Sequence, residues 1–190
     1  MKQFNIVLTV CLIVMVISTV VALHINAQTI KLYRDEVDVL EQITISHQAY
    51  NKPRNTIEVC STSTFKSYMP YRAITDKTSD QYALQQQAET EYRFGLRTLD
   101  DYFMVAVTSQ YGNVGDILEI EFEDNSMLAI IGDIKGNGHD GCQSLRDGSV
   151  IEFIVDMEHL DENIKQLGNF NVVFTGSIKN IYNLGNYKGD

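Results

Sequence analysis

Cysteine is scarce in this sequence, and the few cysteines do not have the spacing of a metal site or a redox pair. The chain of 190 residues contains three, Cys11, Cys60 and Cys142. No two of them form C-x-x-C, and no spacing resembles a zinc motif. The sequence also lacks G-x-S-x-G, the P-loop and the dinucleotide fingerprint. We therefore expect no metal and no cofactor.

Basic residues are outnumbered. The chain carries 15 Lys and Arg against 25 Asp and Glu, which gives a net charge of −10, and every acidic residue follows Leu23. A strongly acidic domain has no electrostatic footprint for nucleic acid. It should also not adhere to anionic lipid or anionic wall polymers by charge alone. The composition thus excludes a nucleic-acid partner.

Charge is absent from residues 6–23, which are predominantly apolar. This is about the length that a helix needs to cross a bilayer, at roughly 1.5 Å rise per residue. Lys2 before it favours a cytoplasmic N-terminus. A cleaved signal peptide is the alternative, with Ala22 or Ala27 before the cut. Both interpretations of residues 1–27 place the rest of the chain outside the cytoplasm, in the cell membrane as a single-pass protein or secreted.

Residues 28–54 are predicted to be a helical stalk and linker. Ile30, Tyr33, Val37 and Leu40 recur at helical spacing within residues 28–50. This pattern indicates either a short amphipathic helix that packs on the domain or a stalk that forms a homo-oligomer. Proline and its neighbours then mark the linker that ends at residue 54.

The remaining residues, 55–190, are predicted to form one mainly β (α+β) domain. Runs with β-branched or alternating apolar residues predict strands. These runs are 56–64, 102–109, 116–122, 127–131, 150–156 and 171–175, with 177–182 as a further candidate. Two helices are expected, one capped by Ser79 or Asp80 and one ended by Gly168. Short strands around one or two helices indicate a small barrel.

The loop Gly132–Cys142 concentrates polar chemistry. It contains four glycines, two aspartates, a histidine and a lysine, directly after a predicted buried strand. Loops held by a rigid barrel are where binding and catalytic residues tend to lie. Within it, Ile134–Asp140 (IKGNGHD) resembles the I-K-G-x-x-x-D signature of the three-aspartate (3D) domains. These are double-psi β-barrels of bacterial lytic transglycosylases and related wall proteins.

The resemblance covers about residues 60–156. It implies a six-stranded double-psi β-barrel-like domain with one or two helices, after the transmembrane helix and stalk. It also implies that Asp140 is the catalytic acid/base, with Asp133 as a shifted second aspartate. Thr108 and Ala129 stand where the family has its other aspartates.

Four residues are candidates for substrate binding. Thr64 and Tyr68 resemble the residues that line the groove of related barrels, and Lys135 and His139 belong to the loop itself. The partner that the resemblance implies is peptidoglycan or another envelope glycan.

The proposed chemistry needs one raised pKa. A lytic transglycosylase manages with a single acid, because the hydroxyl of the sugar attacks in place of water, and that acid must be protonated to begin. Asp133 nearby would raise the pKa of Asp140, whereas protonated His139 would lower it. Asp133, Asp147 and Glu152 are candidates for a second carboxylate.

Several alternatives stay open at this stage. Asp133 and Asp140 could be turn formers beside glycine, or bind a metal together with His139. Cys60 and Cys142 could form a disulfide that closes a loop of roughly 80 residues, or be separate buried thiols. The domain could be a wall-cleaving enzyme, a non-catalytic module that binds glycan or protein, or an assembly module.

Overall fold

The structure is a computed structural model, and it divides into two compact units, residues 1–42 and 43–190. The residues that it describes are 18–21, 23, 55–57, 59, 64–123, 125–136 and 138–188. In the first unit, residues 18–21 and 23 are helical. Among the described residues no helix is long and apolar enough to cross a membrane. The remainder of the predicted span 6–23, and all of the predicted stalk 28–50, lie outside the described residues.

The second unit is mainly β, as predicted, with a mixed sheet and few helices. Its strands are β1 (Asn55–Ile57), β2 (Ser67–Pro70), β3 (Glu89–Thr90), β4 (Arg97–Leu99), β5 (Tyr102–Val107), β6 (Asp116–Glu121), β7 (Ser126–Ile134), β8 (Glu152–Val155) and β9 (Asn180–Asn186). Its helices are the 3-10 turn η1 (Tyr71–Ala73), α2 (Asp80–Gln85) and α3 (Glu162–Leu167).

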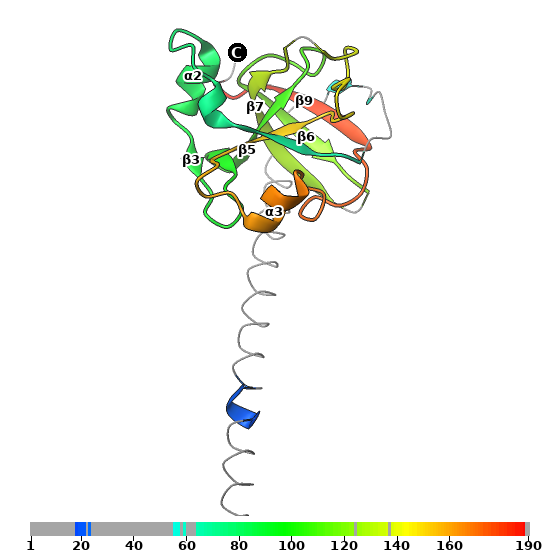
Figure 1. Ribbon diagram of the computed structural model, residues 1–190. Helices are drawn as coiled ribbons and strands as arrows, with labels where there is room; N and C mark the ends of the chain where they lie inside the picture. The colour runs from blue at the N-terminus through cyan, green and yellow to red at the C-terminus, as the bar shows by residue number, and fades with distance from the viewer. Residues whose placement is uncertain are drawn as a thin grey trace, which may run out of the picture. The chain divides into compact units, whose positions relative to one another are not determined.

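Strand β5 is the centre of the sheet (Figure 1). The main path runs β1-β9-β6-β7-β5-β4-β3, and β8 joins it beside β5. Two pairs are parallel, β5 with β7 and β2 with β8, whereas β5 and β8 are antiparallel. The four strands β2, β8, β5 and β7 therefore lie side by side in that order.

The two faces of these four strands bury different side chains. On one face Met104, Ile130 and Ile154 pack together, and Leu84 of α2 covers them. On the other face the Phe153 ring lies 4.6 Å from the Phe174 ring and 4.8 Å from the Phe170 ring, measured between centroids. Fully burying one such large apolar side chain contributes about 1.5–3 kcal/mol.

Two sequence signals for helix ends are confirmed. The Ser79 hydroxyl caps α2 by accepting a hydrogen bond from the Tyr82 N–H at 3.2 Å. Gly168 ends α3 in the left-handed conformation, with φ of 70°. Such conformations favour glycine because it has no Cβ to clash.

One predicted strand is wrong. Residues 171–175 form turns, in which the N–H groups of Val173 and Phe174 both donate to the carbonyl of Phe170. Phe170 and Phe174 thereby both reach the aromatic cluster, one turn apart. The run of apolar residues that indicated a strand serves this packing instead, and the last strand, β9, begins later, at Asn180.

Candidate functional site

A β-bulge determines where Asp133 points. Val105 of β5 lies opposite Ile131 of β7, but the next residue, Ala106, lies opposite Asp133, so Gly132 is an extra residue in β7. Side chains alternate between the faces of a sheet, and a bulge shifts that alternation by one. Without the extra residue Asp133 would share the face of Ile131. With it, Asp133 lies on the face of Met104 and α2.

Any other residue at the bulge would crowd the ends of two core side chains. A Cβ on Gly132 would lie 2.7 Å from Ile154 Cδ1 and 2.9 Å from Met104 Cε. Both neighbours belong to the buried cluster beneath α2. The bulge is therefore built into the core packing of this face.

A row of polar and small residues crosses the four strands at this level. Asp133 lies opposite Ala106, Ala106 opposite Glu152, and Glu152 opposite Ser67. Directly paired residues point to the same face, so these four side chains share one. Neighbouring strands are about 4.8 Å apart, which separates the Cα atoms of Asp133 and Glu152 by about 10 Å. The alanine between them leaves room above the sheet for both carboxylates.

Burial raises the pKa of Asp133. The side chain is half-buried, and loss of water around it raises the pKa above the ordinary value of 3.8. Hydrogen bonds from the Ile134 N–H, at 2.9 Å, and from the Gln81 side chain of α2 oppose this rise, and the negative charge of Glu152 adds to it. Asp133 is thus the carboxyl of the loop region that is held toward its protonated form.

Lys135 holds the following loop in place. Its Nζ donates to the carbonyl of Ser149 at 2.8 Å and lies 3.0 Å from the Ser149 hydroxyl. The same Nζ lies 3.3 Å from Glu152 Oε1, and the two side chains are 6% and 24% exposed. Burial lowers the pKa of Lys135, and Glu152 opposes that shift. Lys135, predicted to bind substrate, therefore uses its Nζ hydrogens for contacts within the protein.

Asp140 has the opposite environment to Asp133. It is exposed, and its Oδ1 accepts hydrogen bonds from the N–H groups of Gln143 and Cys142, each at 2.9 Å. These bonds lower the pKa of Asp140 below its ordinary value. A carboxylate that caps a turn in this way is stabilised in its charged form, which suits a turn former better than a proton donor.

His139 belongs to the same turn. Its Nδ1 accepts from the Gly141 N–H at 3.0 Å, which places the ring proton of a neutral imidazole on Nε2. The carbonyl of Gly141 in turn accepts from the Thr108 hydroxyl at 2.6 Å. Across the described residues no group of three His, Cys, Asp or Glu side chains could hold a metal ion.

The predicted groove residues Thr64 and Tyr68 lie apart from the carboxylate row. Tyr68 is opposite Phe153, so it points to the aromatic face, where its ring meets Phe170 edge-on at 6.1 Å. Thr64 is exposed, and its carbonyl accepts from the buried Lys66 Nζ at 2.8 Å. The structure thus does not bring Tyr68 to the face of Asp133 and Glu152.

Cys142 is disulfide-bonded and 8% exposed. Its Sγ lies 3.1 Å from Gln110 Oε1, which is a contact and not a hydrogen bond, because a disulfide sulfur carries no proton. Cys60 lies outside the described residues, so its pairing with Cys142 stays a prediction.

Sequence reasoning missed two residues of this site. Gln81 reaches Asp133 from α2, and Ser67 ends the polar row with a buried hydroxyl that has no hydrogen-bond partner. Neither has a motif around it, so only the helix position and the strand register could reveal them. In comparisons with family models, curated proteins and solved structures, nothing matches this chain.

Proposed function

We propose that this protein acts outside the cytoplasm on the glycan strands of peptidoglycan, as a lytic transglycosylase-like enzyme. The observation that carries the proposal is Asp133, a half-buried carboxyl with a raised pKa that shares one face of the sheet with Glu152. The resemblance of Ile134–Asp140 to the 3D-domain signature supplies the substrate class. The two parallel strand pairs of the mixed sheet support the double-psi barrel type.

The acid/base role falls to Asp133. In its protonated form it gives a proton to the glycosidic oxygen as the bond from that oxygen to the anomeric carbon breaks. The resulting carboxylate then takes the proton of the 6-hydroxyl of the same sugar, whose oxygen bonds to the anomeric carbon and closes an anhydro ring. A raised pKa serves the first step, because the acid must be protonated at working pH.

Glu152 has a supporting role. Its negative charge raises the pKa of Asp133, and it can stabilise the positive charge that develops at the anomeric carbon. Lys135 fixes Glu152 in turn, at 3.3 Å. Asp140, whose pKa is lowered, shapes the loop by capping its turn.

The location outside the cytoplasm has two supports. Residues 6–23 contain no charge, as a membrane anchor or signal segment requires. The disulfide at Cys142 is typical of proteins in an oxidising compartment, where such bonds form and persist. Residues 28–50 could join copies of the chain, as their helical spacing suggests.

A non-catalytic glycan- or protein-binding module of the envelope is the second candidate. The environment of Asp140 favours it, because the aspartate that matches the 3D-domain signature in register is tied into a turn. A binding module would retain peptidoglycan on pull-down and release no fragments.

The release of soluble fragments separates the two candidates. Full-length protein in detergent is incubated with purified peptidoglycan, and the soluble fraction is analysed by mass spectrometry. The enzyme produces fragments that end in an anhydro sugar, which is lighter by one water than a hydrolysis product. Retention of the protein on peptidoglycan without any such fragment would leave the binding module as the function.

A further inference from the structure

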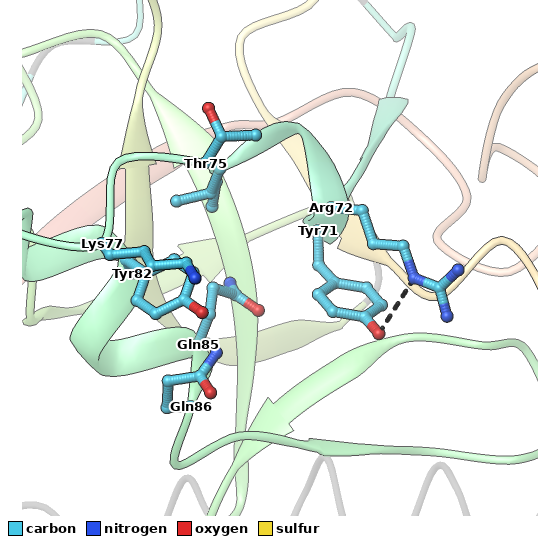
Figure 2. A pocket seen from close by; sticks show the side chains of 8 residues that line it. Tyr71, Arg72, Thr75, Lys77, Tyr82, Gln85 and Gln86 are labelled. Carbon is cyan, nitrogen blue, oxygen red and sulfur yellow. Dashed lines mark hydrogen bonds between the residues drawn. The ribbon is translucent and has the colours of Figure 1, made fainter.

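A pocket of about 330 Å³ lies between η1 and α2. Its volume is at the lower end of the range of ligand sites, roughly 300–1,000 Å³. Figure 2 shows the side chains of Tyr71 and Arg72 on one side of the pocket and those of Tyr82 and Gln86 on the other. The residues that line it are Tyr71, Arg72, Ile74, Thr75, Lys77, Tyr82, Gln85 and Gln86.

The walls of the pocket are aromatic and apolar. Tyr71, Ile74 and Tyr82 are half-buried, so part of each side chain is open to a ligand. The guanidinium carbon of Arg97 lies 4.7 Å from the centre of the Tyr71 ring, and the same guanidinium donates to the Gln85 carbonyl at 3.1 Å. Arg97 thereby fixes the Tyr71 ring against α2. The pocket is preformed, and an apolar group of a ligand can pack against its two rings.

The charged residues of the lining are both cations. Arg72 and Lys77 are exposed, and none of the eight lining residues is acidic, although the chain carries a net charge of −10. Within the described part of the chain Lys77 makes no ion pair. The neighbouring Asp76 accepts two hydrogen bonds from Thr78, at 2.9 and 2.7 Å, and does not line the pocket. The charge of this pocket therefore complements an anion.

Tyr71 and Arg72 present donors that a carboxylate can accept. The Nε of Arg72 donates to the Tyr71 hydroxyl oxygen at 3.2 Å, so the hydroxyl hydrogen is left to donate elsewhere. The Nη1 of Arg72 lies 2.9 Å from Glu158 Oε1, in an ion pair whose side chains are 61% and 62% exposed. Such exposed pairs are weak. Glu158 therefore competes with an incoming carboxylate for Arg72 but does not exclude it.

These features together specify the chemical class of the ligand. We propose that the pocket binds a single carboxylate carried on an apolar body, with the body between Tyr71 and Tyr82 and the carboxylate at Arg72 and Lys77. An ammonium compound would meet two cations, and a neutral ligand would make no use of them. The inference goes beyond the proposed function, because it involves neither Asp133 nor a glycan.

Three small probes test the inference. N-acetylphenylalanine carries the carboxylate, its C-terminal amide has the same body without the charge, and 3-phenylpropionate has the carboxylate and the ring without the acetamido group. Saturation-transfer NMR titrations of the full-length protein in detergent, with detergent alone as the blank, measure their affinities. N-acetylphenylalanine should bind about tenfold more tightly than its amide. Equal binding of this acid and its amide, or no binding of either acid, would overturn the inference.

The two acids identify the source of the ligand, because a free apolar acid and the C-terminal residue of a peptide share this chemistry. If 3-phenylpropionate binds as tightly as N-acetylphenylalanine, the pocket takes free apolar acids. If it binds about tenfold more weakly, the pocket also contacts the acetamido group and takes the C-terminal end of a peptide. Either result supports the inference when the amide binds weakly.

Variants locate the binding. Lys77→Gln should weaken the binding of N-acetylphenylalanine about three- to tenfold and leave that of the amide unchanged, and it should fold normally because Lys77 is exposed. Lys165→Gln is the matched control, with the same change of charge on α3, outside the lining, and should bind as the wild type does.

A third variant has the opposite effect. Glu158→Gln removes the competitor for Arg72 and should strengthen the binding of N-acetylphenylalanine about two- to fivefold. Unchanged binding in both Lys77→Gln and Glu158→Gln would overturn the assignment of the ligand to this pocket. Equal weakening in Lys77→Gln and Lys165→Gln would also overturn it, because the net charge of the protein would then account for the effect.

Discussion

Asp133 at the end of β7 and Glu152 at the start of β8 lie on one face of the sheet, each directly opposite Ala106 of β5. The bulge at Gly132 creates this relationship, because it moves Asp133 onto the face of Glu152. Burial and the negative charge of Glu152 both raise the pKa of Asp133. Four measurable consequences follow from this arrangement and from the buried Lys66.

Replacing Asp133 by asparagine should stabilise the protein at neutral pH. The pKa of Asp133 is raised in the folded state, so the unfolded chain ionises first as the pH rises above 3.8, and stability falls through that window. Asparagine removes the charge and can still accept from Ile134 and Gln81. Thermal unfolding should give a higher Tm for Asp133→Asn than for the wild type at pH 7, and equal values below pH 3.8. A lower Tm of the variant at pH 7 would show that the Asp133 carboxylate does not destabilise the folded protein.

Replacing Glu152 by glutamine should shift the pH profile of peptidoglycan cleavage. Glu152 raises the pKa of Asp133, so its neutralisation lowers that pKa, and a general acid then loses its proton at lower pH. The alkaline limb of kcat/KM should move to lower pH, while burial keeps the pKa of Asp133 above 3.8. If the alkaline limb does not move, or moves to higher pH, Glu152 does not raise the pKa of the catalytic acid.

Replacing Gly132 by alanine should destabilise the fold. The new Cβ would lie within 3 Å of Ile154 Cδ1 and Met104 Cε, the ends of two flexible side chains that must shift within the core, so the cost should be at the low end for overpacking, about 1 kcal/mol. Gly136→Ala is the matched control, because nothing lies within 4 Å of a Cβ there. Urea unfolding of both variants measures the difference. Equal midpoints for the two variants would mean that the Ile154 and Met104 side chains move aside at no cost.

The stability of the protein should rise in alkaline solution through Lys66. This side chain is 1% exposed, and burial lowers its pKa to about 8 from an ordinary 10.5. The unfolded chain therefore holds the proton more tightly between pH 8 and 10.5, and stability rises with pH in that window. The free energy of unfolding of the wild type minus that of Lys66→Met should increase across it. If this difference does not change between pH 8 and 10.5, the Lys66 ammonium is hydrated in the folded protein and its pKa is not lowered.

Much of the fold could be predicted from the sequence, because patterns among neighbouring residues indicate strands, helix caps and helix ends. The alternation in 116–122 and 150–156 gave β6 and β8, the serine before a run of helix formers marked the cap of α2, and Gly168 marked the end of α3. These signals depend on neighbours in the chain. The run 171–175 misled because Phe170 and Phe174 reach the aromatic cluster from a turn, in which the Phe174 N–H donates to the Phe170 carbonyl.

The site was less predictable, because it depends on contacts between distant segments. The sequence pointed to the loop that contains both aspartates but favoured Asp140, which resembles a family signature in register. The roles of the two aspartates are instead separated by burial, which the bulge gives to Asp133, and by the turn hydrogen bonds that Asp140 accepts.

The release of anhydro-sugar fragments from purified peptidoglycan distinguishes Asp133 from Asp140 as the acid, when its rate is compared between Asp133→Asn and Asp140→Asn. Loss of a general acid lowers the rate by about 10²–10⁴-fold, so Asp133→Asn should fall by at least ~100-fold although it remains folded. Asp140→Asn should stay within about threefold of the wild type, because its amide oxygen can still accept the turn hydrogen bonds. A rate that falls in Asp140→Asn and persists in Asp133→Asn would contradict the assignment of Asp133 as the acid.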